Sequence, residues 1–282
     1  MTEPSGRSNA PRCCVSSRHE GVAGGSDVDT APAIRLMALQ LGPEDQAHLD
    51  RVRRRTVMIA TPIARAPVWQ YTLALAETCV LLNGLGVRFH YVTVVGVSNL
   101  PRARNILTAR FLASDATDLL FIDDDVGWDR HDVVRLLAAD QPLIAGVIRK
   151  KSDNAHETAG WCCEFLPDAG ERLARDARGN IEVARAGTGF LRIERRVFAE
   201  LMARHPEWKS SAAPKLPPDE DRFYYRFFRF GEDELTEDYV FCDRWRAAGG
   251  RVFIDPTLRL SHIGEKIYSG AIVELIAPRP AP

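Results

Sequence analysis

Short apolar segments alternate with segments of helical periodicity from residue 56 onward. Four runs have the composition of short strands: TVMIA (56–60), VRFHYVTVV (87–95), DLLFI (118–122) and PLIAGVI (142–148). Apolar residues recur at helical spacing over 68–86. A further helix is predicted from Pro101 to about Ala113, and another over 130–139 with Asp129 as its N-cap. This alternation predicts an α/β fold with an open, mostly parallel central sheet flanked by helices, of the Rossmann-like kind.

The second half of the chain has a less regular pattern. A helix is predicted to run from the N-cap Thr236 to Ala248, followed by a strand, RVFID, and a second short run that ends at His262. The pieces GWCCEFL and NIEVAR indicate a small antiparallel hairpin. In RFYYRFFRF (222–230), arginines alternate with aromatic residues at strand spacing. This run predicts either an amphipathic strand with its rings packed inward or a platform on which a sugar or base stacks.

The two ends of the chain differ from its middle. Residues 1–50 are rich in Ser, Gly, Pro and Ala and lack a hydrophobic period, so we expect a disordered extension. With 277–282 as a flexible tail, one domain remains over 51–276. The basic run RVRRR (51–55) is interpreted as a solvated lead-in to the first strand, with a phosphate or membrane-surface contact as the alternative.

Composition narrows the class of protein. The 282 residues are 45% hydrophobic and 27% charged with a formal net charge of -1, which is typical of a soluble globular protein and does not indicate nucleic acid as a partner. No apolar run approaches the ~20 residues of a membrane-spanning helix, and the N-terminus lacks the apolar core of a signal peptide. The six cysteines show no C-x-x-C spacing, so we expect reduced thiols in a cytoplasmic protein.

Three consecutive carboxylates, Asp123, Asp124 and Asp125, follow the apolar run DLLFI. In open parallel sheets, ligands bind outside the carboxyl ends of the strands, and carboxylate oxygens suit Mg²⁺ or Mn²⁺. If the strand geometry continued, Asp123 and Asp125 would face one side and Asp124 the other. A bare carboxylate cluster raises its own pKa values, so a divalent cation is the expected compensation. The alternative is a solvated acidic turn that caps the next helix.

The run FIDDDV resembles the D-x-D motif of GT-A fold glycosyltransferases, and the nearest relatives would be inverting, family 2-like enzymes. The resemblance covers roughly residues 56 to 270 and includes an E-D pair, Glu237 and Asp238, within GEDELTEDYVFCDRWRAAGG. It implies a sugar transfer from a nucleotide-diphosphate donor to an acceptor hydroxyl, with Asp238 as general base. Glu237 would then help to position the acceptor. For these two acids the alternative is ordinary stabilisation of a helix N-terminus.

The same resemblance implies a metal site and a donor site. Asp125, Asp123 and His262 would hold Mn²⁺ or Mg²⁺, which stabilises the charge on the leaving diphosphate. The donor nucleotide would be contacted by residues after the first strand, at the start of the second predicted helix and among the aspartates: Thr61, Pro62, Arg65, Arg102, Arg104, Asp123 and Asp124. The loop around Thr188, flanked by two glycines, would line the acceptor side.

The expected partners are a UDP-, GDP- or dTDP-linked sugar and an acceptor whose identity the sequence does not specify. Two other functions remain open. One is a non-catalytic, glycosyltransferase-like nucleotide-binding or scaffold protein. The other is a metal-dependent nucleotidyltransferase, although TPIARAPV (61–68) lacks the glycine-rich phosphate loop that such an enzyme would place after the first strand.

Overall fold

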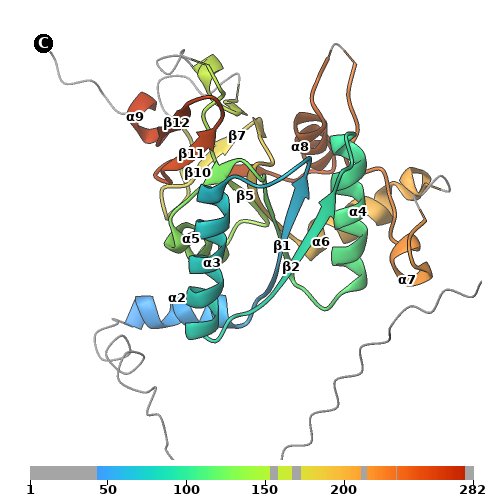
Figure 1. Ribbon diagram of the computed structural model, residues 1–282, viewed down its shortest axis with the longest axis horizontal. Coiled ribbons are helices and arrows are strands. Elements are labelled where there is room, and N and C mark those ends of the chain that lie inside the picture. The colour runs from blue at the N-terminus through green and yellow to red at the C-terminus, as the bar shows by residue number, and fades with distance from the viewer. Residues whose placement is uncertain (1–42, 153–157, 167–172, 211–214, 233, 277–282) are drawn as a thin grey trace, which may run out of the picture. The chain divides into compact units, whose positions relative to one another are not determined.

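The computed structural model describes residues 43–152, 158–166, 173–210, 215–232 and 234–276 (Figure 1). All of them belong to one compact unit, Leu41–Pro282. Most of the extension expected to be disordered, residues 1–42, lies outside the described residues, as does the tail 277–282. The described ranges contain no helix that is both long and apolar enough to cross a membrane.

A seven-stranded, mostly parallel sheet forms the centre of the unit. Its strands lie in the order β2 (Arg88–Val95), β1 (Thr56–Ile63), β3 (Asp118–Ile122), β9 (Phe190–Glu194), β5 (Leu143–Gly146), β10 (Val252–Asp255) and β7 (Ile181–Val183). Five strands run parallel, whereas β9, between β3 and β5, and β7, at the edge, run antiparallel. The predicted α/β class with a mostly parallel sheet is therefore confirmed.

Helices cover both faces of this sheet, as Figure 1 shows. One face packs against α2 (Pro43–Arg53), α3 (Trp69–Gly84) and α5 (Arg130–Ala138), and the other against α4 (Leu100–Ala113), α6 (Arg195–Arg204) and α8 (Glu237–Ala247). Alternate residues of β1 divide between the two faces, since Val57 and Ile59 belong to one apolar cluster and Met58 and Ala60 to the other. A strand buried on both faces needs a continuous apolar run, which explains the segment TVMIA.

Two smaller sheets lie beside the central one. The first is antiparallel, in the order β12 (Ile267–Gly270), β11 (Leu260–Ile263) and β4 (Val126–Gly127), and the second pairs β6 (Cys163–Glu164) with β8 (Arg185–Ala186). The predicted hairpin is thus right in part, because its second piece divides between β7 in the central sheet and β8. The remaining short helical segments are η1 (Thr158–Gly160), η2 (Pro206–Trp208), α7 (Pro218–Asp221) and α9 (Val273–Ile276).

The helix boundaries follow local capping signals. Asp129 caps α5 as predicted: its carboxylate accepts from the backbone N–H of His131 at 2.8 Å, and the Asp132 carboxylate accepts from the N–H of Asp129 at 3.1 Å. Thr236 occupies the N-cap position of α8 but makes no capping side-chain hydrogen bond. The four described cysteines, at 79, 162, 163 and 242, are free thiols.

Three expectations about local structure are wrong. The part of the extension from residue 43 onward is helical, because it begins α2, whose Val52 is fully buried. The basic run is not merely a solvated lead-in, since Arg55 Nη1 donates to the buried Asp118 at 2.7 Å and to Glu194 at 3.1 Å. The segment 222–230 forms no strand beyond a single bridge, at Tyr225. The rings at 227 and 228 are buried and that of Phe230 is exposed, so the inward packing of the rings holds only in part.

Candidate functional site

The three aspartates form a turn at the carboxyl end of β3. The strand ends at Ile122, and the N–H of Val126 donates to the carbonyl of Asp123 at 3.2 Å. The strand geometry therefore does not continue, and the expectation that Asp123 and Asp125 share one strand face fails. Each aspartate has its own partners instead: Asp124 accepts from the backbone N–H of Ala64 at 3.2 Å and is turned toward the loop after β1.

Arg104 connects the first aspartate to the E-D pair. Its Nη2 donates to both carboxylate oxygens of Asp123, at 3.1 and 3.2 Å, and its Nε donates to Glu237 Oε1 at 3.0 Å. Arg104 is 2% exposed and Glu237 is 4% exposed. Segments 133 positions apart in the chain are thus joined by one guanidinium.

Burial and charge compete at this cluster. Burial raises the pKa of Asp123 above its ordinary value, against the opposing effect of Arg104, and Asp125 and Asp238 add to the rise. Burial likewise raises the pKa of Glu237, and the charge of Asp238 adds to it. Burial disfavours the charge on Arg104, but the neighbouring carboxylates outweigh it and raise the pKa of the guanidinium. Both carboxyls of the cluster therefore lose their proton less readily than exposed ones, although each is hydrogen-bonded to Arg104.

Asp125 lies in a different cluster, with Lys151 and His262. The Lys151 ammonium donates to Asp125 Oδ2 at 2.6 Å, and His262 Nε2 lies 3.4 Å from the same oxygen. His262 Nδ1 lies 2.8 Å from the backbone oxygen of Arg149, so this nitrogen carries a proton. Nε2 is therefore the ring nitrogen that faces Asp125.

The charge of Asp125 is already balanced in this cluster. Burial acts to raise the pKa of Asp125, but the hydrogen bonds and charges of His262 and Lys151 together outweigh it and hold the pKa below its ordinary value. Asp125 is thus the carboxyl of the aspartate turn whose pKa is lowered, with a lysine as its counter-ion, whereas burial raises the pKa of Asp123 and of Asp124.

The Gly187–Gly189 segment lies between Asp123 and Asp238. A Cβ on Gly189 would lie 3.2 Å from Asp123 Oδ2, and a Cβ on Gly187 would lie 3.5 Å from Asp238 Oδ2. The two glycine α-carbons are at most about 7 Å apart, because each residue spans no more than ~3.6 Å. The N–H of Asp123 also donates to the Gly189 carbonyl at 3.0 Å. The two carboxylates therefore flank one short backbone segment. The glycines at 187 and 189 allow this segment to lie close to both carboxylates.

Two buried polar groups in this region lack a partner among the described residues. They are the hydroxyl of Thr188, which is 1% exposed, and Nη1 of Arg104. Buried donors without partners are rare in proteins and commonly mark places where a ligand or water binds. Arg104 lies against Asp123, and Thr188 lies between the two glycines that face Asp123 and Asp238.

Only some of the residues expected to contact the nucleotide are exposed at the surface. Thr61 and Pro62 lie within β1, which extends to Ile63, and both are buried; the Thr61 hydroxyl is paired with Tyr71. Arg65, in the loop after β1, is exposed, as is Arg102 in the first turn of α4. Arg104 is buried in its ion pairs and does not present a fork to a phosphate from the surface.

The E-D pair divides into two different environments. Glu237 is buried and its carboxylate is occupied by Arg104, so the expectation that it touches an acceptor does not fit its position. Asp238 is partly exposed and lies against Gly187, and its Oδ1 accepts from the adjacent N–H of Tyr239 at 2.9 Å. Of the two acids, only Asp238 is placed where a ligand can reach it.

The expected metal ligands do not all converge. Within the described ranges, no three His, Cys, Asp or Glu side chains form a group that could hold a metal ion. Asp123 is turned toward Arg104, which leaves Asp125 and His262 as a pair of oxygen and nitrogen donors. Mg²⁺ often binds through one or two protein groups and completes its shell with water and substrate phosphates, so this pair fits such an ion.

Sequence reasoning missed Lys151 and Cys162. Lys151 follows β5, so the rule that pointed to the aspartates, that ligands bind at the carboxyl ends of parallel strands, could have indicated it. Cys162 contacts the segment at Gly187, whose N–H donates to the Cys162 carbonyl at 2.8 Å. Burial raises the pKa of the Cys162 thiol to about 12, and the charge of Asp238 adds to the rise, so the thiol is neutral at ordinary pH.

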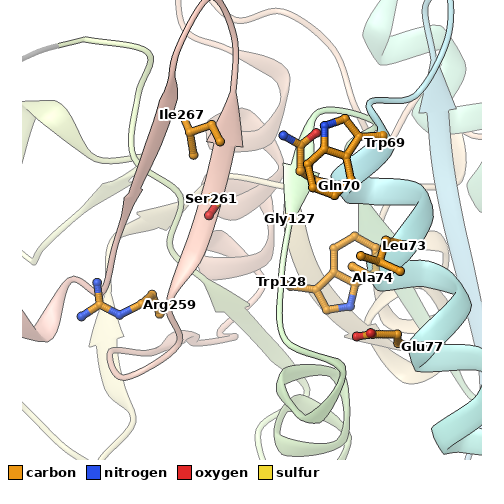
Figure 2. Close-up of a pocket in the computed structure, with 10 residues that line it drawn as sticks. All are labelled: Trp69, Gln70, Leu73, Ala74, Glu77, Gly127, Trp128, Arg259, Ser261 and Ile267. Atoms are coloured by element: carbon orange, nitrogen blue, oxygen red, sulfur yellow. The ribbon is translucent and has the colours of Figure 1, made fainter.

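A separate surface groove of about 260 Å³ lies between α3 and the small three-stranded sheet. Figure 2 shows Trp69 and Leu73 of α3 on one side and Ser261 and Ile267 on the other. Successive residues of a strand face opposite sides, so the groove lies on the face of β11 that Ser261 occupies, away from the face of His262. None of the residues predicted for the site lines this groove.

The comparisons with known proteins assign no family to this site. No protein-family model matches the sequence, and no curated protein matches it.

Proposed function

We propose that the protein is a metal-dependent glycosyltransferase with a GT-A type fold, which moves a sugar from a nucleotide-diphosphate donor to an acceptor hydroxyl with inversion. The observation that supports this most is that Asp123 and Asp238, from the two motifs of the resemblance, flank the single Gly187–Gly189 segment. An inverting transfer needs a leaving side and an attacking side on opposite faces of one sugar ring, with acidic groups serving each.

On the leaving side, Asp125 and His262 would hold Mn²⁺ or Mg²⁺. When bound, the ion supplies positive charge where the diphosphate leaves with the electron pair of the broken anomeric C–O bond. Asp123 would orient the donor, with its own direction set by the two hydrogen bonds from Arg104. Arg65 and Arg102, both exposed, are the basic residues that would meet the nucleotide.

On the attacking side, Asp238 would accept the proton of the acceptor hydroxyl while the acceptor oxygen forms the new bond to the anomeric carbon. Two features of the structure would position the Asp238 carboxylate. Glu237, next to it, is anchored to Arg104 at 3.0 Å, and Gly187 leaves room beside its carboxylate. Thr188, with its unpaired hydroxyl, would donate to or accept from the sugar between the two sides.

A second candidate is a non-catalytic nucleotide-binding protein of the same fold. The observation that favours it is that Asp125 already has a lysine counter-ion, while the described residues contain no group of three metal ligands. Such a protein would bind a nucleotide sugar without metal and without turnover.

Thermal unfolding with a panel of UDP-, GDP- and dTDP-linked sugars, with and without Mn²⁺, separates these functions. A ligand at one hundred times its Kd stabilises the folded state by about 2.7 kcal/mol, which is readily measured. The transferase proposal expects one nucleotide to stabilise the protein only with Mn²⁺, and expects Asp125→Ala to lose this effect. Asp243→Asn, which changes an acid of α8 paired with Arg185 at 2.8 Å, should keep it. Metal-independent stabilisation without turnover would favour the second candidate instead.

A further inference from the structure

The oxygen of Asp125 that a metal ion would need is occupied by Lys151. The ammonium lies 2.6 Å from Oδ2, and this is the oxygen that His262 Nε2 approaches to 3.4 Å. A cation held jointly by Asp125 and His262 has to lie between these two atoms. The lysine ammonium and the metal ion therefore compete for the same carboxylate oxygen.

The position of Lys151 is supported along the length of its side chain. A Cβ on Gly264, in the loop between β11 and β12, would lie 3.0 Å from Cδ and 3.5 Å from Cε of Lys151. The glycine thus leaves the space through which the lysine stem reaches the aspartate. The Lys151 side chain is 38% exposed and that of Asp125 is 28% exposed, so the pair is partly shielded from water yet open to exchange.

We propose that Lys151 is a displaceable counter-ion, which holds Asp125 in the empty protein and passes to the diphosphate when a metal–diphosphate ligand binds. The inference rests on the metal site of the proposed function. A bare cation offers Asp125 a new partner but leaves the lysine charge unpaired beside it. A metal–diphosphate ligand supplies a cation for Asp125 and an anion for Lys151 together, so every charge stays paired.

The chemistry of the two groups fits this exchange. A lysine ammonium is a compact charge on a flexible stem, so it can move from one oxygen anion to another without a fixed geometry. A charge next to a metal site weakens the binding of a like charge and strengthens the binding of an opposite one. Lys151 would therefore select the metal–diphosphate complex against the free metal ion.

The test measures, by equilibrium dialysis against the full chain, the binding of Mn²⁺ alone and of Mn²⁺ with saturating inorganic pyrophosphate, as the excess of Mn²⁺ on the protein side. The variants are Lys151→Met and, as a matched control, Lys150→Met, which removes the same charge from the adjacent exposed residue. We expect Lys151→Met to bind Mn²⁺ alone about tenfold more tightly than the wild type, since no hydrogen-bonded ammonium has to be displaced.

With pyrophosphate present, the order should reverse, and Lys151→Met should bind the Mn²⁺ complex several-fold more weakly than the wild type, while Lys150→Met follows the wild type in both measurements. If Lys151→Met binds free Mn²⁺ no more tightly than the wild type, the inference is overturned, while metal-dependent binding of a nucleotide sugar would still support the proposed function. If the crossover is found but no nucleotide sugar binds, the inference stands and the proposed function fails. If the two variants change Mn²⁺ binding equally, the change follows from the loss of one positive charge in general, and the specific role of Lys151 is overturned.

Discussion

Arg104 Nη2 donates to both carboxylate oxygens of Asp123, at 3.1 and 3.2 Å, from the helix predicted to begin at Pro101. The same guanidinium reaches Glu237 at 3.0 Å. Arg104 thus fixes the directions of two carboxylates, whereas its place in the chain predicted a contact with the donor nucleotide.

Arg104→Met should destabilise the fold. Removing one partner of a buried ion pair leaves uncompensated charge and costs about 3 kcal/mol or more. Arg102→Met, an exposed residue of the same helix, should change the free energy of unfolding by less than about 0.5 kcal/mol. Urea-induced unfolding of both variants measures the difference. Losses of equal size would show that the Arg104 ion pairs do not hold the site together.

Gly189→Ala should disturb the site through packing. The new Cβ would lie 2.5 Å from Ile148 Cδ1, which can move, and 3.2 Å from Asp123 Oδ2, which is held by Arg104. Overpacking of this kind costs about 1–3 kcal/mol, and ligand binding at Asp123 should weaken as well. Gly84→Ala is the control, because nothing lies within 4 Å of its Cβ position at the end of α3. Unfolding and nucleotide-binding measurements on both variants should separate them, and a neutral Gly189→Ala would contradict the close approach.

In the proposed transfer Asp238 is the general base, so Asp238→Asn should slow turnover strongly while it leaves donor binding intact. A general base contributes about 10²–10⁴-fold to the rate, so kcat should fall by a factor in this range. The amide is isosteric and keeps an acceptor oxygen for the N–H of Tyr239. Asp243→Asn, on the same helix, should retain activity. Loss of donor binding in Asp238→Asn would instead assign this residue to the donor side.

Asp132 should make the fold less stable as pH rises from about 4 to 6. Burial raises the pKa of Asp132 from 3.8 to about 6 in the folded protein, with the charge of Asp129 adding to the rise. Between these values the folded state binds a proton that the unfolded state has lost, so stability falls with increasing pH. Asp132→Asn keeps an oxygen to accept from the N–H of Asp129 but cannot titrate. Unfolding followed from pH 4 to 7 should show a smaller decline in the variant, and parallel curves would refute the assignment.

Local features of the sequence determined much of the fold. Buried strands need continuous apolar runs, so β1, β3 and β5 could be located from TVMIA, DLLFI and PLIAGVI. The capping box at Asp129 is likewise a matter of four neighbouring residues. The carboxyl-end rule then indicated the aspartate turn as the place where chemistry would lie. The strand and cap predictions depend on patterns within a few residues of chain, and the carboxyl-end rule needs only the position of a strand end.

The tertiary structure alone decided how the charges of the site are paired. Lys151 reaches Asp125, and Arg104 reaches Glu237, across 26 and 133 positions of sequence. The antiparallel strand β9, inserted between β3 and β5, carries Gly189 to the side of Asp123. Such contacts are set by strand order and by burial, which determine which counter-ion a carboxylate meets. Hydrophobic periodicity indicates which residues are buried. The partner that a charged side chain meets from a distant part of the chain depends on how the helices pack on the sheet.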